Sequence, residues 1–297
     1  MDNNQHNQDH SNVRNIKFAF FLNLIFTFIE IIGGFLTNSM AILADALHDL
    51  GDSLSLGMSW YLENYSQKGA DEKFSYGYAR FSLLGAFINS LVLILGSGFI
   101  LTRVIPRIFN PQAVRPEGML YLAILGIIVN GIAVLKLKGG QSLNRDVVSW
   151  HLLEDVLGWV AVLIVSIVLI YQDLPILDPL LSLAINFYIL YNVISRLKKI
   201  MNIFLQGVPG EIKIEGLEQK IADQPQALAV HHTHVWTLDG EKYFLSTHLI
   251  VSDKSSKEEV IDLKSRVKTL LAEEEIEHVT VEIEYENEDC DSRNCDA

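Results

Sequence analysis

Asp45, His48, Asp49 and Asp52 bring four ionisable side chains into eight positions of an otherwise apolar part of the chain. On an α-helix these positions are related as i, i+3, i+4 and i+7, so the four side chains share one face. Imidazole nitrogens and carboxylate oxygens are ligands that Zn²⁺ accepts at about 2.0–2.2 Å. The spacing therefore predicts a helix face that lines a polar interior or binds a cation.

A second group with the same spacing lies further along the chain. His151 and Asp155 stand four residues apart in "HLLED", with Glu154 beside them. Two helices that each offer a His-x-x-x-Asp pair would supply two imidazoles and two carboxylates, which is enough to enclose Zn²⁺ tetrahedrally. The alternative interpretation is that each pair is only a polar contact between helices, or that the first pair lies on an interfacial helix.

Both groups lie in segments that are apolar enough to cross a bilayer. The 297-residue chain is 49% hydrophobic, with a mean hydropathy of +0.25, which indicates a membrane protein. A charge at mid-membrane costs about 3–17 kcal/mol, so the ionisable faces, and Glu30 in the first segment, are expected to face the protein interior. Since a span needs about 20 apolar residues, the sequence predicts six transmembrane helices near Ile16–Leu36, Met40–Tyr61, Phe81–Val104, Met119–Leu137, Val147–Tyr171 and Pro179–Ile203.

Charge is distributed unevenly along the chain. Residues 211–297 carry −12 of the formal net charge of −13, so an acidic domain is expected to follow a nearly neutral membrane domain. Nucleic-acid binding is disfavoured because no basic patch is present. Lys and Arg concentrate in the flanks that face the cytosol if the N-terminus is inside, and only Arg103, Arg107 and Arg115 fall on the other side. Both termini are therefore predicted to be cytoplasmic, with the protein in the cell (inner) membrane.

The C-terminal part has the patterning of a small α+β domain. Helical periodicity at 211–223 and 255–272, and alternation at 230–238, 243–251 and 279–285, predict the order αββαβ of a ferredoxin-like fold. We expect a disordered segment at 1–15, a six-helix transmembrane domain at 16–207 and a cytoplasmic domain at 208–286. An acidic tail at 287–297 holds Cys290 and Cys295, and we interpret it as solvated.

These residues resemble the cation diffusion facilitator family, in its zinc-transporting branch. The resemblance is carried by "GGFLTNSMAILADALHDLGDS", "FSYGYARFSLLGAFIN" and "HLLEDVLGWVAVLIVSIV". It implies that His48, Asp52, His151 and Asp155 form the transport site. Spacing alone does not settle the roles of the remaining acids of the first face, and the resemblance leaves Asp45 and Asp49 as supporting residues or as part of the ion path.

The resemblance also implies a second metal site in the cytoplasmic domain. Matching the family's regulatory sites favours His231, His248 and Glu284 as ligands, with weaker matches at His234, His278 and Glu282. Strand alternation predicts that His232 and His234 share one face while His231 points the other way. No histidine lies between His48 and His151, so the metal site that some members carry in the loop after the second span is not expected.

The expected function is export of Zn²⁺, with Cd²⁺ or Co²⁺ as further substrates, by alternating access in exchange for protons. The expected partners are the ion, protons, the lipid bilayer and a second copy in a homodimer. No enzymatic activity and no cofactor are expected, since Zn²⁺ serves as substrate and regulatory ligand. The alternatives are a membrane-bound zinc sensor without transport and an intramembrane metalloprotease, and the latter lacks the His-Glu-x-x-His string it would need.

Overall fold

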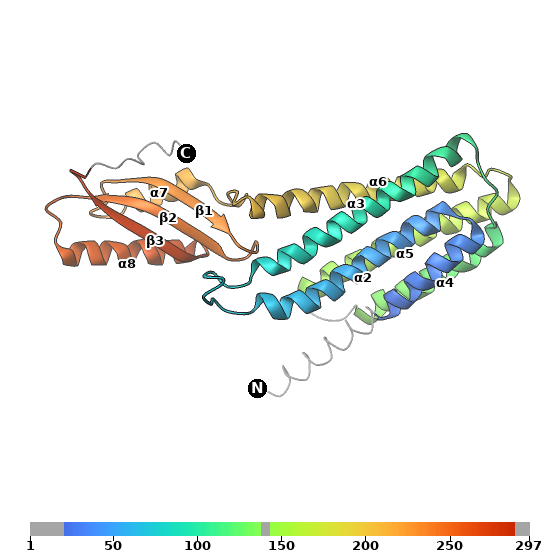
Figure 1. Ribbon diagram of the computed structural model, residues 1–297, viewed down its shortest axis with the longest axis horizontal. Coiled ribbons are helices and arrows are strands. Elements are labelled where there is room, and N and C mark those ends of the chain that lie inside the picture. The colour runs from blue at the N-terminus through green and yellow to red at the C-terminus, as the bar shows by residue number, and fades with distance from the viewer. Residues whose placement is uncertain (1–20, 138–142, 289–297) are drawn as a thin grey trace, which may run out of the picture. The chain divides into compact units, whose positions relative to one another are not determined.

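The computed structural model describes residues 21–137 and 143–288, and Figure 1 shows their helices and strands. The chain divides into two compact units. The first comprises residues 1–64 and 84–197, and the second comprises residues 65–83 and 198–297. The terminal segment predicted at 1–15 and both cysteines of the acidic tail lie outside the described residues.

The first unit is built from helices. A helix at Phe21–Thr37 precedes α2, and then come α2 (Met40–Ser66), α3 (Arg80–Phe109), α4 (Pro116–Leu137), α5 (Leu143–Tyr171) and α6 (Leu177–Phe204). Within the described ranges, three helical segments are long and apolar enough to cross a membrane, namely Arg80–Phe109, Leu153–Tyr171 and Leu177–Phe204. The helices Phe21–Thr37 and Pro116–Ile132 are apolar but shorter. The 27-residue α2 carries the acidic face, which lowers its apolarity.

The outward faces of these helices carry large apolar side chains. Phe35, Leu95, Leu135 and Tyr171 each expose 70% or more of their surface. Apolar exposure on this scale is unfavourable in water and is expected where lipid surrounds the helices. The unit is therefore a membrane domain.

Small residues let α4 and α5 approach closely. Trp159 on α5 is fully buried and packs edge-on against Phe26, with ring centroids 5.5 Å apart. Gly126 on α4 faces the same indole, and a Cβ at this position would overlap the ring. Close contact at glycine is how helices in a membrane gain van der Waals packing.

The start of α2 is fixed by an acid from α6. Asp178, which is fully buried, accepts hydrogen bonds from the Ser39 hydroxyl at 2.5 Å and from the Met40 backbone N–H at 2.8 Å. Asn38 adopts a left-handed φ of 57°, and its backbone carbonyl accepts a hydrogen bond from the Arg107 guanidinium at 2.8 Å. The orphan N–H groups at the start of α2 thus find partners inside the protein.

The second unit holds a small domain in the predicted order αββαβ. Its elements are α7 (Ile214–Ala222), β1 (Ala229–Thr237), β2 (Tyr243–Val251), α8 (Lys257–Glu273) and β3 (Ile276–Tyr285). The sheet order is β1-β2-β3, with β1 antiparallel and β3 parallel to β2. Both helices contribute to one core with one face of the sheet, formed by Leu217, Ile221, Val235, Leu245, Leu249, Val251, Leu263, Val267, Leu271 and Ile276.

The loop between α2 and α3 belongs to the second unit and is held by its own side chains. The Asp71 carboxylate accepts hydrogen bonds from the Tyr78 hydroxyl at 2.7 Å and from the backbone N–H groups of Lys73 and Phe74, each at 2.8 Å. The Tyr78 hydrogen bond, together with those from the backbone, lowers the pKa of Asp71. The same hydrogen bond raises the pKa of Tyr78 to about 12.

Candidate metal centres

The acidic face of α2 lies inside the membrane domain. Asp45 and Asp49 are buried, and His48 and Asp52 are partly buried one turn apart. The Nε2 atom of His48 lies 3.6 Å from an Asp52 carboxylate oxygen, so both side chains reach toward the same point. The helical spacing predicted from the sequence is present, because α2 runs without interruption from Met40 to Ser66.

Helix α5 adds an acid to this face. Asp155 is buried and interacts electrostatically with Asp45 and with Asp49. Gly158, one turn further along α5, leaves room for Asp45, since a Cβ at Gly158 would lie 3.6 Å from an Asp45 carboxylate oxygen. His151 falls within α5, one turn before Asp155, but its side chain lies outside the described residues.

The first helix contributes a further carboxyl group. Glu30 is completely buried and interacts electrostatically with Asp45, Asp49 and Asp155. Both Glu30 carboxylate oxygens are buried, as is one carboxylate oxygen each of Asp45 and Asp49. The apolar surroundings of Glu30 in the sequence predicted an inward orientation, and the structure places it against the α2 face.

Glu154 is directed away from this group. It is exposed and accepts a hydrogen bond from the Tyr188 hydroxyl of α6 at 2.9 Å. The two neighbouring acids of "HLLED" are therefore in different environments, with Asp155 buried toward α2 and Glu154 at the surface.

Several carboxyl groups in a low-dielectric interior repel one another when ionised, because Coulomb energies grow as the dielectric constant falls. They remain stable there only if they bind protons or a cation. The described part of this cluster offers the imidazole of His48 and carboxylates from three helices. Nitrogen and oxygen donors of this kind fit Zn²⁺ and related divalent ions.

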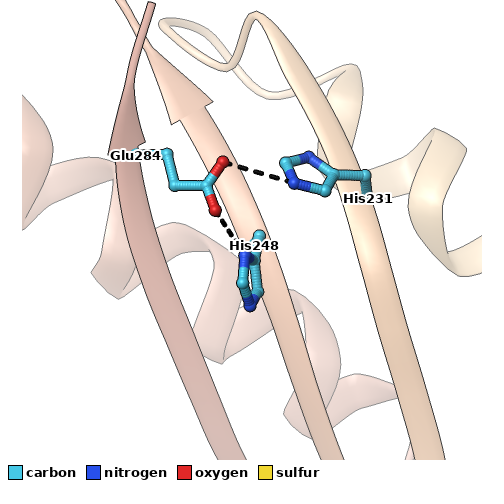
Figure 2. A group of neighbouring side chains, drawn as sticks. All are labelled: His231, His248 and Glu284. Atoms are coloured by element: carbon cyan, nitrogen blue, oxygen red, sulfur yellow. Dashed lines mark hydrogen bonds and ion pairs between the residues drawn. The ribbon is translucent and has the colours of Figure 1, made fainter. Parts of the chain in front are cut away.

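A second cluster lies on the sheet of the C-terminal domain. Figure 2 shows the side chains of His231, His248 and Glu284, from β1, β2 and β3, pointing toward one another. The Nε2 atom of His231 lies 3.2 Å from one Glu284 oxygen, and the Nδ1 atom of His248 contacts the other. One ligand atom from each of the three residues lies within 4.8 Å of those of the other two, which is close enough for a single metal ion.

The predicted alternation along β1 is wrong at the histidines. His231 pairs with His248 and His234 pairs with Ser246, so β1 has one extra residue between these pairs. This β-bulge puts His231 on the same face as His232 and His234. The ring centroid of His248 lies 5.3 Å from that of His231 and 4.9 Å from that of His232.

The weaker candidates occupy different positions. Glu282 lies 3.4 Å from the Nε2 atom of His248 and is largely exposed. His278 instead packs against Phe244 and Tyr76, with ring centroids 5.2 and 5.9 Å away. Burial, followed by the neighbouring His232 and His248, lowers the pKa of His234.

The chain has a bundle of apolar helices with a buried cluster of histidine and carboxylates, and a small domain with a second such cluster. These features define a membrane protein that binds metal cations. Residues 16–205 match the family "Cation efflux transmembrane domain", and residues 209–286 match "Cation efflux protein, cytoplasmic domain". The chain belongs to the cation efflux family, which is the cation diffusion facilitator family indicated by the sequence motifs.

Its relatives are similar along nearly the whole chain. It is 31% identical to "Zinc transporter ZitB" of Pectobacterium atrosepticum, over 98% of this chain and 91% of that protein. It is 32% identical to "Cadmium, cobalt and zinc/H(+)-K(+) antiporter" of Bacillus subtilis, over 95% of this chain and 91% of that protein. A solved structure of the metal-bound C-terminal domain of the CzcD transporter is 28% identical, and the match covers 25% of this chain and 99% of that one at a TM-score of 0.22.

Proposed function

We propose that this protein exports Zn²⁺ from the cytosol and accepts Cd²⁺ and Co²⁺ through the same path. The observation that carries the proposal is the buried cluster at α2 and α5, in which Asp155 interacts with Asp45 and Asp49 beside the His48–Asp52 pair. A cation with two positive charges offsets the repulsion among these acids. The names of the relatives, which include zinc, cadmium and cobalt, point to the same group of ions.

In this proposal His48, Asp52, His151 and Asp155 are the ligands of the transported ion. The two histidines supply nitrogen and the two aspartates supply oxygen, a donor set that suits tetrahedral Zn²⁺. Asp45, Asp49 and Glu30 lie near Asp155 and near one another, where their negative charge attracts the ion along the path and helps to orient its ligands. The protein acts as a carrier rather than as an enzyme, in agreement with its family.

Transport is proposed to exchange the metal ion for protons. An unperturbed imidazole titrates at about pH 6.5, and a proton on the ligating nitrogen removes the lone pair that binds metal. Metal and proton therefore compete for the same atoms, so release of one favours binding of the other. The antiporter name of the Bacillus subtilis relative supports this coupling.

The proposed architecture is a homodimer with six spans in each chain and both termini in the cytosol. The cytoplasmic domain would bind Zn²⁺ through His231, His248 and Glu284, and binding stabilises the transport-competent state only if that state binds the ion more tightly. Here Zn²⁺ acts as a regulatory ligand, and the two nitrogens and the carboxylate fit it.

Flux measured in proteoliposomes tests the proposal. Wild-type protein is expected to transport zinc and cadmium in the direction opposite to the protons that flow down an imposed pH gradient. The variant His48→Asp exchanges a nitrogen ligand for an oxygen ligand, so it is expected to lower zinc flux and to alter the ratio of zinc flux to cadmium flux. A zinc sensor without transport would give no flux in any variant. Zinc flux that ignores the pH gradient would contradict proton exchange while leaving export intact.

A further inference from the structure

A cavity of about 480 Å³ lies within the second unit, between the loop that joins α2 to α3 and the end of β1. Its volume falls in the range of sites that bind small molecules. The residues that line it include Lys73, Tyr76, Arg80, Phe81, Gln206 and Trp236. None of the residues proposed above as metal ligands belongs to its lining, so the cavity is separate from both metal clusters.

The charged side chains that line the cavity are basic. Lys73 comes from the loop, and Arg80 is the first residue of α3. Among the described residues that line the cavity, none is acidic. The Asp71 carboxylate, two residues before Lys73, is engaged by the Tyr78 hydroxyl and by two backbone N–H groups. In a chain with a formal charge of −13, this cavity therefore offers positive charge to an anion.

Arg80 has a donor that the protein leaves unpaired. The residue is partly buried, and its Nε atom is buried and has no hydrogen-bond partner among the described residues. An unpaired donor of a charged side chain is costly to bury. A guanidinium pairs its N–H donors with the oxygens of a phosphate group. The chemistry of Arg80 is thus suited to an anionic, phosphate-like ligand.

Aromatic rings hold the walls of the cavity in place. Trp236 of β1 stacks on Phe244 of β2, with ring centroids 5.7 Å apart. Tyr76 of the loop meets the same Phe244 ring edge to face at 5.3 Å. Phe81 of α3 packs against Phe74 of the loop, with centroids 5.6 Å apart. The loop and the sheet are joined through Phe244, so the basic side chains stand beside a fixed aromatic wall.

The cavity lies where helices that can span the membrane end. Arg80 begins α3, which is long and apolar enough to cross a bilayer, and Gln206 follows the end of α6 by two residues. Trp and Tyr side chains are enriched at the boundary between hydrocarbon and water. Basic pockets at the ends of transmembrane helices bind anionic lipid headgroups. An anionic phospholipid supplies both a phosphate for the basic side chains and apolar groups for the aromatic wall.

We propose that this cavity binds the headgroup of an anionic phospholipid. The phosphate lies on the Arg80 guanidinium with the Lys73 ammonium beside it, and the glycerol region lies against Trp236. A lipid in this position contacts the loop, the start of α3 and the end of β1 together. The proposal concerns lipid binding alone and is measured without transport, so its outcome is independent of whether the protein exports Zn²⁺.

The test measures lipid binding to the full-length protein in a neutral detergent. Protein that has been washed free of lipid is titrated with dioctanoyl phosphatidylglycerol, with zwitterionic dioctanoyl phosphatidylcholine or with inorganic phosphate, and binding is followed by calorimetry. The variants are Arg80→Gln and Lys73→Gln. The matched control is Lys68→Gln, which removes the same charge from an exposed lysine of the same loop that does not line the cavity.

Wild type and Lys68→Gln are expected to bind phosphatidylglycerol saturably and in preference to phosphatidylcholine. Arg80→Gln is expected to weaken phosphatidylglycerol binding at least about tenfold, because it removes charged hydrogen bonds to the phosphate. Lys73→Gln is expected to weaken it about fivefold, which is the effect of one basic residue at a membrane surface.

Equal affinity of the wild type for the two lipids would overturn the proposal. Equal affinity of Arg80→Gln, Lys73→Gln and Lys68→Gln for phosphatidylglycerol would also overturn it. Inorganic phosphate that binds as tightly as phosphatidylglycerol would show a site for a free anion and would contradict lipid recognition. If Arg80→Gln does not fold, Lys73→Gln, which alters an exposed side chain, is judged by the same criterion.

Discussion

The carboxylate of Asp178, in the first turn of α6, accepts a hydrogen bond from the backbone N–H of Met40, the first residue of α2, at 2.8 Å. The same carboxylate accepts a hydrogen bond from the Ser39 hydroxyl, and the Ser182 hydroxyl donates a hydrogen bond to the Met40 carbonyl at 2.9 Å. An acid from one helix thus serves as the N-terminal cap of another. Because α2 carries His48 and Asp52, this contact helps to position the two residues that we propose as ligands of the transported ion.

Replacing Asp178 by alanine is expected to destabilise the membrane domain. The change leaves the buried Met40 N–H and Ser39 hydroxyl without their acceptor, and hydrogen bonds to charged groups contribute about 1.5–3 kcal/mol each. We expect a free energy of unfolding about 2–4 kcal/mol lower, measured by thermal unfolding of the purified protein in detergent. Asp173→Ala, which removes an exposed acid from the preceding turn, is the control and should be nearly neutral. Equal stability of both variants would contradict this role for Asp178.

Gly126→Ala is expected to disrupt the contact between α4 and α5. A Cβ at position 126 would overlap the rigid, fully buried indole of Trp159, and overpacking of this kind costs about 1–3 kcal/mol. Gly131→Ala in the same helix meets no atom within 4 Å and serves as the matched control. If the melting temperature falls only for Gly126→Ala, the result agrees with close packing of Gly126 against Trp159. Equal changes in melting temperature for the two variants would contradict it.

Gly158 tests how closely α5 approaches the acidic face of α2. Alanine fits at this position, because its Cβ would lie at van der Waals distance, 3.6 Å, from Asp45. Leucine does not fit and would displace the Asp45 carboxylate. Zinc flux is expected to be close to wild type for Gly158→Ala and at least about tenfold lower for Gly158→Leu, as for other changes beside a metal site. Full activity of the leucine variant would show that Asp45 does not lie against this part of α5.

The loop between α2 and α3 is expected to respond to pH at both ends of the scale. The pKa of Asp71 is lowered by the Tyr78 hydroxyl, so its stabilising effect is present above the ordinary pKa of aspartate and is lost as pH falls through the lowered value. The pKa of Tyr78 is raised to about 12, so its effect is present below about pH 10 and is lost as pH rises toward 12.

Ultraviolet titration of tyrosinate checks this prediction. The difference between wild type and Tyr78→Phe isolates the Tyr78 transition, which is expected near pH 12. Asp71→Asn removes the acceptor carboxylate and should return the transition toward the ordinary value of about 10. A Tyr78 transition that is identical with and without Asp71 would show that the hydrogen bond is absent in solution.

Features that depend on neighbours in the sequence could be predicted. The four-residue spacing of His48 and Asp52 places both on one face of α2, and alternation together with a turn at Gly240 predicts the β1–β2 hairpin. Each follows from helix or strand geometry acting over a few residues.

Features that depend on contacts between distant segments could not be predicted. The cap on α2 joins residues 138 positions apart, and no local pattern marks Asp178 as its acceptor. The bulge in β1 is set by pairing with β2, so strict alternation placed His231 on the wrong face. The polar surroundings of Glu30 likewise come from α2 and α5 rather than from its own helix.

Zinc flux in proteoliposomes, compared between wild type, Asp155→Asn and Glu154→Gln, tests the central claim most directly. The two variants make the same acid-to-amide change at adjacent positions, one buried against the α2 face and one exposed beside Tyr188. If Asp155 helps to bind the transported ion, Asp155→Asn lowers zinc flux at least about tenfold and Glu154→Gln leaves it near wild type. Equal flux in wild type and Asp155→Asn would contradict the assignment of the buried cluster as the transport site.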